Sequence, residues 1–364
     1  MAIVASCSTN KLQYPEAPAD NTVDDYFGVQ VADPYRPLEN DTSAATLKWV
    51  EEERALTESY LSKIPFRKDI RERLKTLYDY KKPGMPSKKD GWYYFYENDG
   101  LQNQSVLYRT RSLDDKPEVF LDPNKLSDDG TVALTGISTS NDGKYTAYTI
   151  SRSGSDWTEI YVMDTETKEL LPDHIEWAKF TDAAWQGDGF YYSAYDKPVD
   201  GKEFSHANEN HRVYYHKIGT PQSDDKLVYE DKDHPLHFHS ASVPDDESAL
   251  IIYGGGEGLG SSITMKSLKD PNAKWVTVEP SQDYDISILD IIDGTMYIYT
   301  NYGAPRYRLM TASVKAPQRE NWKELVPEGE GVLSGVNFAG DKLILTYDID
   351  ASNRLYVYSV SYTH

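Results

Sequence analysis

The sequence predicts an all-β fold of the β-propeller type, preceded by a short helical segment. Three observations carry this prediction. Apolar residues recur at helical spacing before about Tyr78, and after it they alternate with polar residues as in half-buried strands. Tyrosine is frequent, with 29 among 364 residues, and aromatic residues favour strands. Short strands separated by polar turns then repeat at a near-constant interval to the end of the sequence.

Two amphipathic helices are expected before the strands. The stretch 41–64 begins with Asp41, Thr42 and Ser43, which can all cap a helix N-terminus, and Pro65 ends it. The stretch 66–80 forms the second helix. The apolar residues at helical spacing are Trp49, Leu56 and Tyr60 in the first helix and Ile70, Leu74 and Leu77 in the second. Both apolar faces need a surface to cover them.

The repeat that follows is typical of propeller blades. Six hairpin-turn signals lie near Gly91, Gly143, Gly189, Glu247, Gly294 and Gly340, at successive intervals of 52, 46, 58, 47 and 46 residues. About 50 residues of short strands is the length of one blade, and one blade cannot bury both faces of its sheet. A large sandwich is the alternative, but sandwiches rarely keep one period over such a length. We therefore expect about six blades.

The charge pattern excludes some partners. The formal net charge is -21, and a nucleic-acid binder needs a basic footprint, so no nucleic-acid partner is expected. The acidity is interpreted as a solubility feature. No run of about 20 apolar residues is present, so no transmembrane helix is expected.

The single cysteine, Cys7, cannot form an internal disulfide. It follows Val4-Ala5-Ser6, and small residues before a cysteine resemble the end of a bacterial lipoprotein signal. Residues 1–13 are therefore either the remnant of such a signal, with Cys7 lipidated, or a disordered start. The first alternative implies a periplasmic or membrane-anchored protein, and the second leaves a cytoplasmic one.

No catalytic residue, cofactor or metal site is assigned from the sequence. A Gly-x-Ser-x-Gly nucleophile elbow is absent, and the nearest glycine-rich run, 254–263, places Ser261 and Ser262 without the required glycine. That run is interpreted as a flexible loop between strands.

Two runs of the sequence resemble metal-binding motifs, but both are incomplete. His237 and His239 would share one face of a strand near His234, which suggests zinc, but no cysteine or well-spaced carboxylate completes the set. The run 122–130 resembles a calcium loop, but Leu126 stands where an acidic or amide side chain is needed. The pair Asp156-Trp157 is expected to serve a turn and packing.

Several segments resemble prolyl oligopeptidases. They are "YPEAPADNTVDDYFGVQVADPYRPLEN" (14–40), "GLQNQSVLYRT" (100–110), "VFLDPNKLSDDGTVALTGISTSNDGKYTAYTISRSGSDW" (119–157) and "KFTDAAWQGDGFYYSAYD" (179–196). The resemblance extends from about residue 14 to the end and weakens between roughly 225 and 280. It implies a serine peptidase with a seven-bladed propeller and an α/β-hydrolase domain, which cleaves short peptides after proline.

The resemblance also implies how the chain is divided. Residues 14–77 would pack on a hydrolase domain, and 78–364 would be an incomplete propeller that gates and lines the active site. The catalytic triad would lie in the hydrolase domain, so the chain alone is expected to be inactive, with short proline-containing peptides as its partners. Phe180, in "KFTDAAW", matches a substrate-contacting phenylalanine of the family, and the alternative is that Phe180 is simply a core residue.

One departure leaves a second hypothesis open. In the family, an arginine and a cysteine contact substrate from the turn equivalent to "YGGGEGLG", where this sequence has glycines and Glu257. With the setting of Cys7, this favours the alternative of a non-enzymatic, surface-anchored propeller that binds a peptide or glycan.

Overall fold

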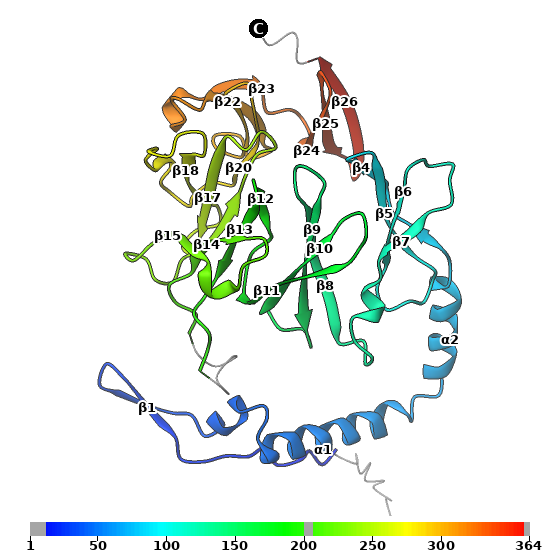
Figure 1. Cartoon of the computed structure of the whole chain (residues 1–364). Helices are drawn as coiled ribbons and strands as arrows, with labels where there is room; N and C mark the ends of the chain where they lie inside the picture. The colour runs from blue at the N-terminus through cyan, green and yellow to red at the C-terminus, as the bar shows by residue number, and fades with distance from the viewer. Residues whose placement is uncertain (1–11, 200–206, 360–364) are drawn as a thin grey trace, which may run out of the picture. The chain divides into compact units, whose positions relative to one another are not determined.

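The computed structural model describes residues 12–199 and 207–359 (Figure 1). The chain forms two compact units. The first holds the residues up to Lys82 with Asp99–Leu101 and a short stretch near residue 198, and the second holds the other described residues. Cys7 lies outside the described residues, so its lipidation stays a prediction. None of the helices in the described ranges has the length and apolar character that a bilayer span requires.

The first unit contains a hairpin and the two expected helices. Its elements are β1 (Val23–Tyr26), β2 (Val29–Ala32), the 3₁₀ turn η1 (Arg36–Glu39), α1 (Ala44–Leu61) and α2 (Arg67–Tyr78). Ser43 caps α1, because its side-chain oxygen accepts the N–H of Thr46 at 3.1 Å. Pro65 lies between the helices, where the sequence predicts the break.

Both helices carry apolar side chains that this structure leaves open to solvent. Leu47 on α1 and Ile70, Leu74 and Leu77 on α2 each keep about half of their surface exposed. A groove of about 510 Å³ follows α2 and is lined by Arg67, Ile70, Arg71, Leu74, Lys75, Tyr78 and Leu101. An apolar face of this kind marks an interaction surface.

The second unit consists of six antiparallel blades, which we number 1 to 6 in chain order and which form five sheets (Figure 1). Blades 2 and 3 join into one eight-stranded sheet, through a single pairing of Ala178 with Ala194. The all-β propeller fold is confirmed.

Blade 1 contains β3 (Lys82–Pro83), β4 (Ser87–Lys89), β5 (Trp92–Asn98), β6 (Val106–Thr110) and β7 (Glu118–Leu121). Blade 2 contains β8 (Val132–Thr139), β9 (Tyr145–Arg152), β10 (Thr158–Asp164) and β11 (Leu170–Ala178), and blade 3 contains β12 (Ala184–Gln186), β13 (Gly189–Ala194), β14 (Arg212–Lys217) and β15 (Lys226–Glu230).

The remaining blades follow the same order. Blade 4 contains β16 (Phe238–Ser242), β17 (Ala249–Gly255), β18 (Ser262–Ser267) and β19 (Val276–Glu279). Blade 5 contains β20 (Ile286–Ile292), β21 (Thr295–Thr300), β22 (Arg308–Ser313) and β23 (Lys323–Val326). Blade 6 has three strands among the described residues, β24 (Val332–Ala339), β25 (Lys342–Ile349) and β26 (Ser352–Ser359). Short 3₁₀ turns lie at η2 (Pro123–Lys125), η3 (Gln222–Asp224) and η4 (Arg319–Asn321).

The six turn signals each fall in the first hairpin of one blade. Gly91, Gly143, Gly294 and Gly340 take positive φ there, as does Glu247 in blade 4. The third turn differs from the expectation in one detail. Gly187 provides the positive φ, whereas Gly189 begins β13 at a place where a Cβ would lie 2.1 Å from the carbonyl oxygen of His216. The repeat in the sequence is therefore the repeat of the blades.

The hydrophobic core is divided among the contacts between neighbouring blades. Five clusters of buried side chains join blades 1 and 2, 2 and 3, 3 and 4, 4 and 5, and 5 and 6. The cluster between blades 4 and 5, for example, contains Ile251, Ile263, Ile288 and Met296. None of these clusters, drawn from the described residues, joins blade 1 to blade 6. Each blade is thus stabilised by its neighbours in the chain.

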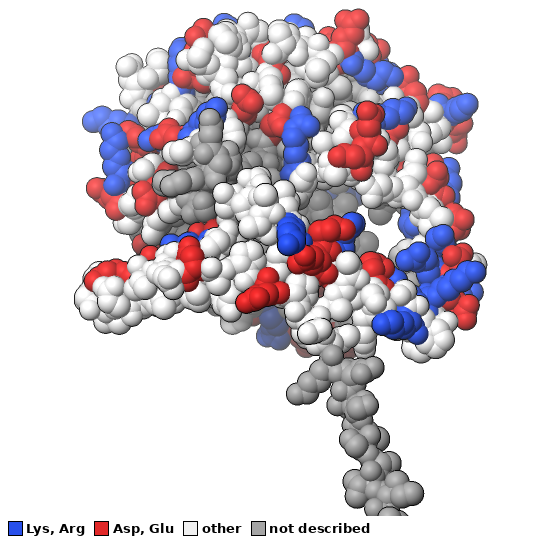
Figure 2. All heavy atoms as spheres, turned by 90° about the horizontal axis from the view of Figure 1, so that it is seen from below, with Lys and Arg blue, Asp and Glu red and all other residues white. Residues whose placement is uncertain are grey.

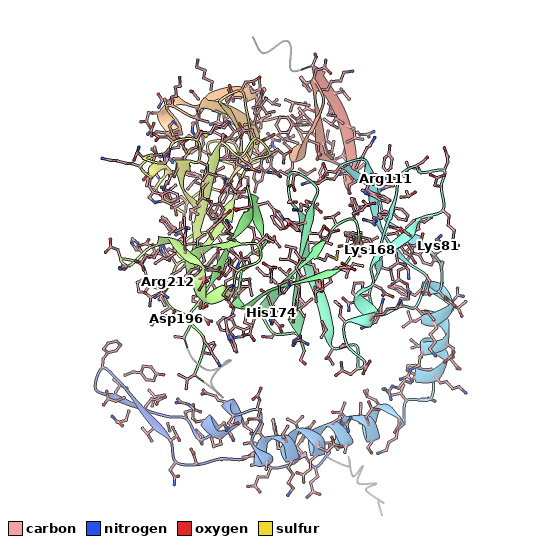
Figure 3. All side chains as sticks on the ribbon, viewed as in Figure 1. Lys81, Arg111, Lys168, His174, Asp196 and Arg212 are labelled. Atoms are coloured by element: carbon pink, nitrogen blue, oxygen red, sulfur yellow. The ribbon has the colours of Figure 1, made fainter. Side chains whose placement is uncertain are left out.

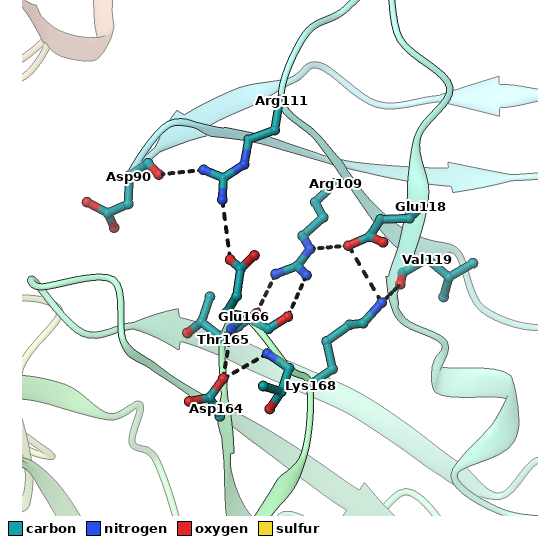
Figure 4. Close-up of polar contacts among 10 residues, drawn as sticks. Asp90, Arg109, Arg111, Glu118, Val119, Asp164, Thr165, Glu166 and Lys168 are labelled. Atoms are coloured by element: carbon teal, nitrogen blue, oxygen red, sulfur yellow. Dashed lines mark hydrogen bonds and ion pairs between the residues drawn. The ribbon is translucent and has the colours of Figure 1, made fainter.

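Buried charged side chains also form contacts between neighbouring blades. Arg109 on blade 1 is 2% exposed. Its guanidinium donates to the carbonyl oxygens of Thr165 and Glu166 on blade 2 and to the carboxylate of Glu118 at 2.6 Å (Figure 4). Arg111, two residues on, reaches the carboxylate of Glu166 at 3.3 Å but is half exposed. Other charged side chains lie at the surface. On the face drawn in Figure 2, basic and acidic side chains are interspersed.

A buried histidine fastens blade 2 to blade 3. The His216 side chain is fully buried and lies between two carboxylates, with Nδ1 2.8 Å from Asp225 and Nε2 3.0 Å from Asp173 on blade 2. Burial alone would lower its pKa, but the hydrogen bonds and charges of Asp225 and Asp173 outweigh it and raise the pKa above the ordinary value. Protonated His216 can donate to both carboxylates.

Replacing Arg109 with methionine should destabilise the propeller by about 2–4 kcal/mol, because the Thr165 and Glu166 carbonyls would lose their donor in a buried place. Arg111→Met is the matched control and should cost less than about 1 kcal/mol, because that side chain is solvated. Urea unfolding of the three proteins measures both values. Equal losses for the two variants would contradict the assignment.

The stability that His216 provides should depend on pH. Because its pKa is raised in the folded state, the contribution is fully present below the unfolded pKa of about 6.5 and is lost as pH rises through the folded pKa. The free energy of unfolding of wild type minus that of His216→Gln should therefore shrink between pH 6 and pH 9. A difference that stays constant or grows over this range would show that His216 is buried neutral.

Candidate functional site

An aromatic surface forms where blades 2, 3 and 4 meet. The chain leaves β11 at Ala178 and enters the short β12 at Ala184. Between them, Phe180 has a φ of +52°, and Trp177 just before has +60°, a region that costs an aromatic residue free energy. The hydroxyl of Thr181 accepts the N–H of Ser193 at 2.8 Å, which holds the connection against β13. This backbone leaves half of the Phe180 side chain exposed.

Six rings gather around this connection, and we call them the aromatic rim. They are Trp157, Trp177, Phe180, Tyr195, His211 and Phe238. Phe180 lies 5.5 Å from Phe238 of blade 4 and 6.3 Å from His211 of blade 3, between ring centroids. Trp157 meets Trp177 and Tyr195 edge-on at 5.6 and 6.0 Å. Phe180 thus lies outside the five core clusters, and its half-exposed ring packs against His211 and Phe238.

A buried lysine contacts two rings of the aromatic rim. Lys179 is 6% exposed, and its Nζ lies 4.9 Å from the ring centre of Trp157 and 5.3 Å from that of Phe180. Its carboxylate partner is Asp156, 3.7 Å away and itself largely exposed. The Lys179 ammonium group therefore orients the rings of Trp157 and Phe180, while most of the Asp156 side chain is exposed to solvent.

A neutral histidine links the rim to blade 4. Burial lowers the pKa of His211 to about 4, so the ring is neutral near pH 7. Neutral His211 can donate from Nε2 to the Lys179 carbonyl at 3.0 Å and accept the N–H of His239 on Nδ1 at 2.8 Å. The residues next to Tyr195 and His211, Asp196 and Arg212, form an ion pair of 2.6 Å at the edge of this region (Figure 3).

A polar cavity of about 530 Å³ opens beside Phe180. Its walls come from β8, β9, β10 and the β9–β10 connection of blade 2, from β16 and β17 of blade 4, and from the β11–β12 connection, and most of the lining residues carry a hydroxyl group. The lining side chains include Thr135, Thr149, Ser151, Asp156, Phe180, Asp182, Ser240 and Tyr253. A cavity with many hydrogen-bonding groups and one exposed aromatic ring is suited to a peptide, whose backbone needs donors and acceptors.

The glycine-rich loop after β17 is closely packed against a neighbouring segment. A Cβ on Gly258 would lie 2.0 Å from the carbonyl oxygen of Gln282, and one on Gly260 would lie 1.7 Å from that of Tyr284. Gly260 N–H donates to the Gln282 carbonyl at 2.9 Å. The backbone of this loop is thus held in place against residues 282–284, although the sequence suggested a flexible connection. Only glycine permits so close an approach.

The other sequence candidates have structural partners. The Ser262 hydroxyl donates to the Gly254 carbonyl at 3.3 Å, and the Asp122 carboxylate in the calcium-like run accepts the N–H of Asn124 at 3.1 Å. Trp157 serves packing, as expected. His239 faces His211 and does not pair with His237, because His237 lies ahead of β16.

Sequence reasoning singled out Phe180 but missed the residues that hold it. Tyr195, His211 and Phe238 lie 15 to 58 positions further along the chain and reach the rim only through the packing of three blades. The available signal was the local density of aromatic residues in "EWAKF" and "YYSAYD".

Comparison with known proteins identifies the fold. The family model described as "Prolyl oligopeptidase, N-terminal beta-propeller domain" matches residues 14–364. A prolyl endopeptidase of Elizabethkingia miricola is 38% identical over 98% of this chain and 50% of its own length, and prolyl oligopeptidase A of Amanita bisporigera is 33% identical over 98% and 52%. The chain spans about half the length of these curated relatives.

Solved structures agree. Prolyl oligopeptidase B from Galerina marginata, bound to a 35mer hydrolysis and macrocyclization substrate, superimposes with a TM-score of 0.81 at 29% identity, over 95% of this chain and 52% of that one. Sequence and fold together show that the chain belongs to the prolyl oligopeptidase family and corresponds to its N-terminal β-propeller portion.

Proposed function

We propose that this chain is the substrate-admitting propeller of a proline-specific serine endopeptidase and that the aromatic rim contacts the peptide. The half-exposed ring of Phe180, held at the mouth of a hydroxyl-lined cavity, is the observation that supports this most directly. The relatives named prolyl endopeptidases support the substrate class.

The rim suits proline for a physical reason. The pyrrolidine ring is apolar, compact and already restricted in φ, so it loses little entropy when it packs on an aromatic face. Phe180 and Phe238 offer two such faces 5.5 Å apart between centroids. The hydroxyls and the Asp156 and Asp182 carboxylates of the cavity can bind the peptide backbone beside the proline.

The chemistry of cleavage needs groups beyond these residues. Acyl transfer in this family requires a nucleophilic serine with its histidine and carboxylate. The 364 residues contain no Gly-x-Ser-x-Gly elbow. In this proposal the propeller gates and lines the site, and the exposed faces of α1 and α2 pack on the hydrolase domain that carries the triad.

The 364-residue chain should not hydrolyse a chromogenic Gly-Pro substrate, because no activated nucleophile is assigned in it. The assay compares the chain with a buffer blank over several purification steps. Turnover that copurifies with the chain at constant specific activity would overturn this part of the proposal.

The chain should bind a short proline-containing peptide weakly, and Phe180→Ala should weaken binding about five- to tenfold, which corresponds to roughly 1 kcal/mol for one aromatic contact. Phe27→Ala, which removes a fully exposed ring from the β1–β2 turn, is the matched control and should change nothing. Isothermal titration calorimetry gives the three affinities. Equal affinity for wild type and Phe180→Ala would contradict the proposal, and preferential binding of a glycan would favour a non-enzymatic binding module instead.

A further inference from the structure

A second polar site lies in the segment that connects blades 3 and 4. Asp231, His234 and His237 each offer one potential ligand atom, and these three atoms lie within 4.8 Å of one another. They border a cavity of about 400 Å³ that is also lined by Glu257, Gln282 and Asp283. No part of the proposed peptidase function uses this cluster.

The connecting turn fixes the direction of the Asp231 carboxylate. Its Oδ1 accepts the backbone N–H groups of Asp233 at 3.0 Å and His234 at 3.3 Å. Oδ2 is then directed at the His234 ring and lies 2.9 Å from its Nδ1. The rings of His234 and His237 stack with centroids 4.6 Å apart and planes 8° from parallel. One carboxylate oxygen and two imidazoles are thus brought together by the seven-residue segment 231–237.

His237 supplies the observation that points to a ligand. The residue is 8% exposed, and its buried Nε2 has no hydrogen-bond partner of acceptable geometry. The Glu257 carboxylate lies 3.2 Å from that nitrogen. The Gln282 amide nitrogen lies 3.4 Å from Nδ1, at the outer limit of a hydrogen bond, so it does not fix which ring nitrogen carries the proton. A buried imidazole nitrogen without a hydrogen-bond partner is a group that a bound metal ion can satisfy.

Local charge favours a cation. Three carboxylates, those of Asp231, Glu257 and Asp283, line the cavity, and no lysine or arginine is among the described residues that line it. Lys232, next in the chain, pairs with Glu230 at 2.8 Å. A recess lined with one sign of charge concentrates ions of the other sign.

We propose that Asp231, His234 and His237 bind a zinc ion, with Glu257 as the fourth ligand. Two imidazoles with carboxylate oxygens suit Zn²⁺, which takes four ligands at about 2.0–2.2 Å, about 3.3 Å from one another in a tetrahedron. Contraction from the present spacing is available, because the side chains of His234 and Glu257 are half or more exposed and can turn.

The metal would fasten two parts of the chain that are separate in sequence. Asp231, His234 and His237 precede β16, and Glu257 follows β17 in the glycine-rich loop. Metal binding would therefore tie the entry of blade 4 to the loop that already packs on Gln282 and Tyr284.

The test is a titration of the full 364-residue chain with Zn²⁺ in a non-coordinating buffer, followed by calorimetry, with Co²⁺ absorption as a second readout. Wild type should bind one Zn²⁺ saturably, and Co²⁺ should give tetrahedral d–d bands without a thiolate charge-transfer band, which excludes Cys7 as a ligand. His234→Ala should weaken binding about tenfold or more, because it removes one of four ligands. Its side chain is half exposed, so the fold should survive.

His174→Ala is the matched control. His174 also pairs with a carboxylate, Glu159 at 2.9 Å, and lies on β11, away from the cluster in sequence (Figure 3). Its removal should leave Zn²⁺ affinity unchanged. The proposal is overturned if the wild type shows no saturable binding, if His234→Ala binds Zn²⁺ as tightly as wild type, or if His174→Ala loses affinity equally.

Discussion

The structure depends on the burial of each blade's faces against the neighbouring blades. A small antiparallel sheet has two faces and cannot cover either by itself. The chain solves this with five apolar clusters, each shared by two consecutive blades. Arg109 and His216 add buried polar contacts across two of these interfaces, and such directional contacts fix the register in which neighbouring sheets pack.

The candidate peptide site follows from this arrangement. The aromatic rim takes its residues from blades 2, 3 and 4, and the bridge between Ala178 and Ala194 brings the first two blades together beside it. Neutral His211 then joins the Lys179 carbonyl to the backbone of His239. Phe180 is therefore held by interfaces that the fold needs for its own stability, which allows its ring to stay exposed without losing its position.

The sequence was informative wherever the local chain decides the structure. The tight turns, the two helices and the blade repeat depend on residues close in sequence, and they were predicted. The support of Phe180 was not, because Tyr195, His211 and Phe238 meet it only in three dimensions. The histidines show the same limit. Alternation along a strand placed His237 beside His239, but His237 precedes β16, and the turn directs it toward Asp231 instead. Gly258 and Gly260 suggested a flexible loop. The backbone that they approach lies some 24 residues further along the chain, so the local sequence does not show that the loop is closely packed.

Recognition of proline by the aromatic rim can be observed by nuclear magnetic resonance of the tryptophan side-chain N–H groups. One short proline-containing peptide is added, and then the same peptide with alanine in place of proline. The resonances of Trp157 and Trp177 should shift with the proline peptide and stay in place with the alanine peptide. Equal shifts with both peptides, or shifts confined to tryptophans outside the rim, would contradict it.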